Sequence, residues 1–233
     1  MTIGTRPAGV VATAGRWEPP LDYYLIHGPH AGPRPAAGVE ALVVEEFVRA
    51  ADWTTIGLRG AVWTPSEPAW WSDAAHHRAL RADPGLRARV VPVDRAGAEA
   101  THRRLGGGPL PDEASLRARF DDEQAFPVAA PLRLGPVEVP DGFAERRVYR
   151  VLFAGEPPAR RVPDVTATQG RRQVGEDRFD WTLRRVGRGL AWSLDLTVLL
   201  ATAADRAVGP VLHELTSTVR LCGLVPVTTE RFD

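Results

Sequence analysis

The sequence predicts an α+β fold in which helices cover one face of a mainly antiparallel sheet. Two segments carry this prediction. Residues 190–201 alternate between apolar and polar side chains, which is the pattern of a strand that packs on one side only. Residues 208–222 place their apolar side chains on one helical stripe, and a strand-like run follows at 224–232. A helix between antiparallel strands is typical of the α+β class.

The first half of the chain alternates strand-like and helix-like segments. Strands are expected at 23–27, 54–64 and 86–93, and helices at 39–50, 72–83, 94–105 and 112–121. The first of these helices is predicted because apolar residues recur at helical spacing, with Glu45 and Arg49 paired across one turn on the solvent side. Ser72 and Asp94 are the expected N-caps of the next two helices.

The second half has a more regular pattern. Strands are expected at 146–153, 179–186, 190–201 and 224–232, a helix at 208–222 and a long loop at 155–178. The elements after the loop follow the order β-β-α-β, which is most of a ferredoxin-like α+β unit. The first half of the chain has a similar but less regular series of strands and helices. A pseudo-duplicated fold, in which the two halves repeat one arrangement, is therefore the alternative to a single sheet.

Prolines separate the two halves. They stand at 127, 131, 136 and 140, a spacing that excludes a helix and favours extended chain. The apolar residues between them indicate a strap that lies on the core, because a solvated linker would be richer in Ser, Gly and charge. We expect an N-terminal α+β half at 1–125, a proline-rich strap at 126–143 and a C-terminal ferredoxin-like half at 144–233. The alternative is one continuous domain.

The composition excludes several chemistries. The chain contains no lysine and no asparagine, and all 29 basic side chains are arginine, a bias that points to a GC-rich bacterial genome of the actinobacterial kind. Without a lysine ammonium the protein cannot form a Schiff base, anchor pyridoxal phosphate or use a phosphate-loop lysine. The single cysteine, Cys222, permits no internal disulfide and is expected in the core. No segment reads as a signal peptide or a membrane span, so we expect a soluble cytoplasmic protein without a membrane partner.

Histidines near a predicted strand end and a predicted helix start are the candidate catalytic residues. His27 and His30 fall at the end of the first strand and in the turn after it, a position from which side chains reach a cleft. Asp73 and His77 lie one turn apart at the start of the second helix, where an Asp can orient an imidazole that acts as general acid or base. An ordinary helix-surface contact is the alternative for this pair. The sequence identifies no metal site and no cofactor.

Arginine doublets mark residues 144–189, which carry 11 Arg against 6 acidic residues, a net charge of +5 against −5 elsewhere. Arginine forks bind phosphate or carboxylate, and the aromatic residues between the doublets can stack on rings. The expected partner is phosphate-bearing: a nucleotide, a coenzyme-A-like ligand or RNA, held by at least three arginines on one face. The alternative is a solvated surface in a lysine-free protein. The candidate ligand-binding residues are Arg147, Arg150, Arg172, Arg184, Arg188 and Trp181.

Two functions from different classes remain. The first is a binding or assembly subunit with Trp- and Arg-rich surfaces, whose partner is an anionic ligand, a nucleic acid, another protein or a second copy of the chain. The second is a small-molecule enzyme that uses histidine general acid/base catalysis on an anionic or aromatic substrate. We favour binding, because no catalytic constellation in the sequence is complete. A closed concavity that brought His27, His30 and Asp73 together would favour the enzyme.

Overall fold

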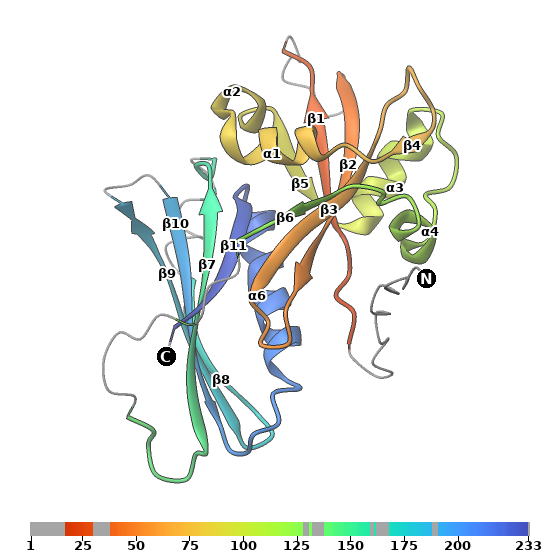
Figure 1. Cartoon of the computed structure of the whole chain (residues 1–233). Helices are drawn as coiled ribbons and strands as arrows, with labels where there is room; N and C mark the ends of the chain where they lie inside the picture. The colour runs from red at the N-terminus through yellow and green to blue at the C-terminus, as the bar shows by residue number, and fades with distance from the viewer. Residues whose placement is uncertain are drawn as a thin grey trace, which may run out of the picture.

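The structure is a computed structural model of the chain and describes residues 17–29, 38–127, 131, 138–158, 161, 168–187 and 191–232. Its strands form two antiparallel sheets, one from each half of the chain (Figure 1). The predicted α+β class is confirmed, but two sheets replace the single sheet that we expected. None of the helices in these ranges is long and apolar enough to cross a membrane.

The N-terminal sheet has the strand order β4-β3-β2-β1-β5, with β6 also paired to β3. Its strands are β1 (Asp22–His27), β2 (Val39–Arg49), β3 (Thr55–Trp63), β4 (Trp70–Trp71), β5 (Val90–Val93) and β6 (Glu123–Ala125). The helices of this half are α1 (Ala74–Ala82), α2 (Pro84–Arg87), α3 (Arg95–Arg104) and α4 (Glu113–Arg117). Aspartates cap all four, since their carboxylates accept hydrogen bonds from otherwise unpaired first-turn amides.

Helices cover both faces of the N-terminal sheet. Leu80 of α1 and Leu86 of α2 pack on one face, whereas Ala98 of α3 and Leu116 of α4 pack on the other. The prediction of helices on one face is therefore wrong for this sheet. The central strands lie between two apolar layers and are buried on both sides.

Strand β2 replaces the helix predicted at 39–50. Its residues Leu42, Val43 and Val44 are all fully buried, and successive side chains enter the two opposite apolar layers. A strand buried on both faces reads as a continuous apolar run without alternation, and this run also fits helical spacing. The correction moves Glu45 from the solvent side into the interior, where its exposed fraction is 1%.

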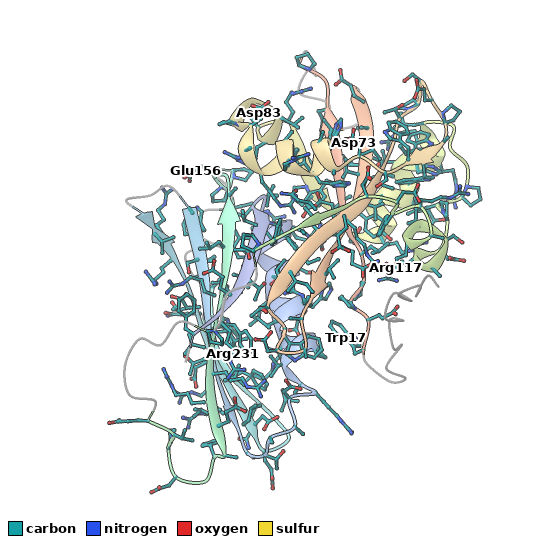
Figure 2. All side chains as sticks on the ribbon, in the orientation of Figure 1. Trp17, Asp73, Asp83, Arg117, Glu156 and Arg231 are labelled. Atoms are coloured by element: carbon teal, nitrogen blue, oxygen red, sulfur yellow. The ribbon has the colours of Figure 1, made fainter. Side chains whose placement is uncertain are left out.

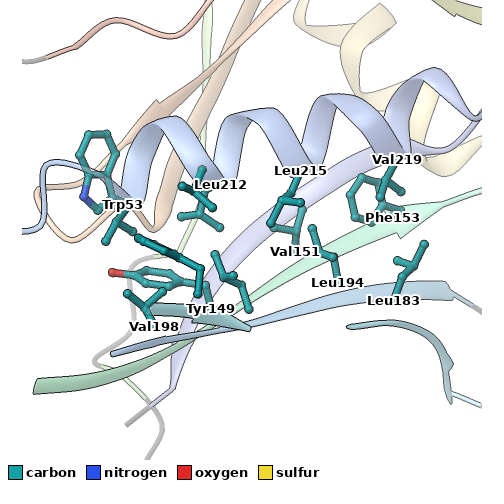
Figure 3. Close-up of a cluster of buried hydrophobic side chains, with 14 of the residues drawn as sticks. Trp53, Tyr149, Val151, Phe153, Leu183, Leu194, Val198, Leu212, Leu215 and Val219 are labelled. Carbon is teal, nitrogen blue, oxygen red and sulfur yellow. The ribbon is translucent and has the colours of Figure 1, made fainter. Parts of the chain in front are cut away.

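The C-terminal sheet has the strand order β11-β7-β10-β9-β8, and α6 (Val208–Leu221) covers one of its faces. Its strands are β7 (Glu145–Ala154), β8 (Gln169–Val174), β9 (Asp177–Val186), β10 (Ala191–Leu200) and β11 (Val225–Phe232). The strand predicted at 190–201 is β10, in the middle of this sheet. Figure 3 shows Leu212, Leu215 and Val219 of α6 packed on its apolar face. Strand β8 lies where a loop was expected, because its mostly polar sequence has no strand pattern.

The finer fold predictions stay predictions. The connection from β7 to β9 contains β8 in its described part, whereas a ferredoxin-like unit has a helix there. The two sheets also differ in strand number and order, which gives no support to a pseudo-duplication. The expected strap lies partly outside the described residues.

The two halves pack against each other through α6 and the turn between β2 and β3. In Figure 1, α6 lies between the two sheets. Arg220 of α6 donates to the carbonyl oxygens of Tyr23 and Val93 in the N-terminal sheet. In the opposite direction, Trp53 of the β2–β3 turn enters the C-terminal core and lies against Gly209 of α6. These contacts leave one face of the C-terminal sheet, the face away from α6, as its outer face.

Candidate functional site

The predicted catalytic residues do not meet within the described residues. His27 ends β1, and its partial burial lowers its pKa. Asp73 caps α1 (Figure 2), accepts a hydrogen bond from the His76 amide and lies 3.2 Å from Nδ1 of the same histidine. Because an N-cap carboxylate faces the first turn, Asp73 pairs with His76 and not with His77 as expected. His30 lies outside the described residues.

His77 points into the protein, toward Glu45 on β2. Its Nδ1 is 2.7 Å from Oε1 of Glu45, and both side chains are buried. Arg81, one turn further along α1, donates to the two carboxylate oxygens of Glu45 at 2.9 and 2.8 Å. The His77 ring also lies against Gly60, where a Cβ atom would come within 2.5 Å of it. Nε2 of His77 has no hydrogen-bond partner in the described part of the chain.

This buried centre is suited to holding the fold together and not to binding a substrate. Burial opposes the charge of Glu45, but Arg81 and His77 outweigh it and lower the carboxyl pKa to about 2. All three side chains are at least nine-tenths buried. Sequence reasoning missed the centre because it placed Glu45 on the wet side of a helix, although a glutamate inside an apolar run was an available signal. Among the described residues, no group of three His, Cys, Asp or Glu can hold a metal ion.

Two of the predicted ligand-binding arginines project toward α6. Arg147 lies 2.7 Å from Asp205, and Arg172 lies 2.9 Å from Glu214 of α6. Trp181 shares this side of the sheet: its ring packs against the core, 6.0 Å from the Arg172 guanidinium. The charges of both arginines are thus compensated on the helix side of the sheet.

The other two described arginines project from the outer face, where they share one carboxylate. Nε of Arg150 is 2.7 Å from Oδ1 of Asp195, and Nε of Arg184 is 2.9 Å from its Oδ2. Arg188 lies outside the described residues. The expected set of three arginines on one face is therefore not found among the four that are described. Two of these four project toward α6, and two project from the outer face.

A hollow of about 590 Å³ opens on the outer face over β8, β9 and β10. The register places Asp195 opposite Thr182 and Asp180 opposite Thr197, so carboxylates and hydroxyls alternate across the floor. Trp181 and Gly170 border the hollow as well, although the indole ring packs on the α6 side. The polar residues that line it are Gln169, Arg171, Asp180, Thr182, Asp195 and Thr197.

Asp195 anchors the first of two arginine–aspartate groups in and around this hollow. Its Oδ1 accepts hydrogen bonds from Arg150 and from Ser193 Oγ, and its Oδ2 accepts from Arg184. Burial opposes the ionisation of Asp195, but these hydrogen bonds outweigh it and lower the pKa. The Arg150 guanidinium also lies 4.8 Å from the Phe232 ring centroid, within the range of a cation–π contact. The group therefore holds two guanidinium ions around one carboxylate.

Asp180 forms the second group, toward the edge strand β8. Its carboxylate accepts from Nε of Arg171 and lies 3.4 Å from Nε of Arg178. Asp180 and Asp195 are diagonal neighbours across β9 and β10, a relationship that separates backbone positions by about 7–8 Å. The hollow thus has an arginine–aspartate group on each side of its threonine floor.

Comparisons with known proteins identify no family for this chain. No protein-family model, curated protein or solved structure matches the chain. The chemistry of the outer face therefore rests on the residues of this chain alone.

Proposed function

We propose that this protein is a binding protein that holds an anionic ligand on the outer face of its C-terminal sheet. The observation that carries the proposal is the hollow over β8–β10, which is lined by Arg171, Asp180 and Asp195. Arg150 and Arg184 border it through Asp195, and Arg178 borders it through Asp180. Each group combines two arginines with one aspartate and so keeps a formal charge of +1. An anion in the hollow would be attracted by both groups.

The fixed orientation of the arginines supports binding. In the described part of the chain, the Nη1 atoms of Arg150 and Arg184 have no protein partner, while their other nitrogens are held by Asp195. Guanidinium groups that are already oriented lose less conformational entropy when a ligand binds. On the neighbouring strands of this face, Glu230 of β11 lies opposite Arg150 and Arg146 of β7 lies opposite Leu199.

Catalysis by histidine has less support. The described candidates lie on β1, at the start of α1 and in the buried centre with Glu45, and each of the two on α1 is paired with a different acidic or imidazole partner. In the hollow, Asp195 has a lowered pKa and is a poor proton donor at neutral pH. The residues over β8–β10 are better suited to holding a ligand than to transferring protons.

Calorimetric titration tests the proposal with inorganic phosphate, citrate and glucuronate as probes. At least one anion should bind, and the affinity should fall as NaCl is raised, because exposed charges are screened. The double variant Arg171→Ala/Arg184→Ala should bind at least tenfold more weakly. Arg172→Ala is the matched control, since Arg172 is the neighbour of Arg171 in sequence but faces α6. Absence of binding by all three anions, or equal loss in the control, would refute the proposal.

A further inference from the structure

We infer that the ligand of the outer face carries hydroxyl groups beside its acid group, as a sugar acid or a sugar phosphate does. The inference rests on the proposed function and narrows its ligand class. It follows from the floor of the hollow, which offers hydrogen-bond acceptors as well as cationic donors.

The two aspartates differ in how many of their acceptor sites are occupied. Asp195 accepts from Arg150, Arg184 and Ser193, so that its two oxygens are nearly saturated by protein donors. Asp180 has one hydrogen bond from Arg171 and a longer ionic contact with Arg178. Asp180 therefore keeps lone pairs for a donor from the ligand, whereas Asp195 serves to orient its arginines.

This difference gives the hollow two unlike ends. Near Asp195, Arg150 and Arg184 border the hollow through their shared carboxylate without lining it, and their Nη1 atoms can donate to an anionic group that reaches past Asp195. Near Asp180, a carboxylate can accept from ligand hydroxyls, and Thr182 and Thr197 between the ends can donate or accept. A ligand that fits both ends has an acid group on one side and hydroxyl groups a few ångströms away.

Ligands with only one of these features fit less well. A bare anion leaves Asp180 without a hydrogen-bond donor from the ligand. A nucleic-acid backbone brings a phosphate to each end, and the phosphate at the Asp180 end supplies no hydrogen-bond donor to that carboxylate. A neutral sugar satisfies Asp180 but leaves the arginine donors at the other end without an anion. The combination of acid and hydroxyl groups on one ring matches the arrangement.

Calorimetry on the full chain can separate these ligand classes. The probes are glucuronate and glucose 6-phosphate, which combine acid and hydroxyl groups, against glucose, acetate, inorganic phosphate and a six-nucleotide single-stranded RNA. At least one of the first two should bind tenfold more tightly than every other probe, and the better of them identifies the acid group. If acetate or inorganic phosphate binds equally well, this inference fails while the proposed function stands. If glucose binds equally well, or no probe binds, both fail; tighter binding of the RNA overturns the inference.

Replacing Asp180 should change the affinities for inorganic phosphate and for the sugar ligand in opposite directions. Asp180→Asn removes a negative charge, so it should strengthen binding of inorganic phosphate, yet it should weaken the preferred sugar acid or sugar phosphate at least tenfold. Thr182→Val, which keeps the charge, should weaken the same sugar ligand and leave phosphate unchanged. If Asp180→Asn shifts the affinities for phosphate and the sugar ligand in the same direction, the hydroxyl groups do not contact Asp180 and the inference is wrong. Circular dichroism spectra verify that both variants are folded.

Discussion

Oε1 of Glu45 lies 2.7 Å from Nδ1 of His77, and this buried contact joins the middle of the N-terminal sheet to α1. Arg81 extends it to the other half of the chain, because its Nε donates to the carbonyl oxygen of Pro226 on β11. The centre therefore stabilises both the position of α1 and the packing of the two halves.

Replacing the carboxylate should reveal this role. Glu45→Gln leaves the buried Arg81 guanidinium without its counter-ion, and breaking a buried ion pair in this way costs about 3–5 kcal/mol. Urea unfolding followed by tryptophan fluorescence measures the loss. The control is Glu40→Gln on the same strand, where the Glu40–Arg89 pair is partly exposed and a change below about 1 kcal/mol is expected. Equal effects of the two substitutions would show that the buried centre is not a major source of stability.

Glu45 should also make the stability of the protein depend on pH. The folded pKa of Glu45 is about 2 against an ordinary value of 4.5. A lowered pKa contributes stability that is complete above the unfolded value and is lost as pH falls toward the folded value. The wild type should have a larger free energy of unfolding than Glu45→Gln at neutral pH. We expect about 3 kcal/mol of this difference, the part due to the pKa shift, to be lost between pH 4.5 and 2. A difference that stays constant over this interval would contradict the assignment.

Trp53 and Gly209 form a second contact between the halves. Trp53 has a φ of 71°, unfavourable for a bulky residue, and an added Cβ at Gly209 would lie 2.3 Å from its ring. Gly209→Ala should therefore destabilise the protein by about 1–3 kcal/mol through overpacking. In a Trp53→Leu background the same substitution should cost much less. A double-mutant cycle from urea unfolding measures this coupling, and additive effects would show that the two residues do not interact.

The middle of the C-terminal core should not tolerate a charge. Leu196 on β10 is fully buried beneath α6, and an unpaired carboxylate there costs several kcal/mol against a total stability of about 5–15 kcal/mol. We expect Leu196→Asp to abolish soluble expression. Leu221→Asp is the control, because Leu221 is 44% exposed at the end of α6. A soluble Leu196→Asp protein with a cooperative unfolding transition would contradict the fold of this half.

The two elements that carried the fold prediction, β10 and α6, each bury one face. In β10 the buried Leu194 and Leu196 alternate with the less buried Asp195 and Thr197, and α6 carries a single apolar stripe. β2 was predicted as a helix because it is buried on both faces and has no alternation. Two-sided burial depends on which helices pack on the sheet, and that contact is not encoded within the strand.

The candidate site could be predicted only in part. Alternation along a strand sends the two members of an arginine doublet to opposite faces, so Arg184 reaches the outer face while Arg185 does not. The pairing of Arg150 with Asp195 depends on the neighbouring positions of β7 and β10, residues 45 apart in sequence. Strand β8, which supplies Arg171 to the hollow, has no sequence pattern that separates it from a loop.

An amide chemical-shift map of the labelled protein, titrated with glucuronate, shows directly where on the protein a ligand binds. Binding on the outer face predicts that the largest shifts occur at residues 169–171, 180–184 and 195–197, with small shifts at His27 and at His76 of α1. Largest shifts at those histidines would contradict binding on the outer face and would favour histidine general acid/base catalysis.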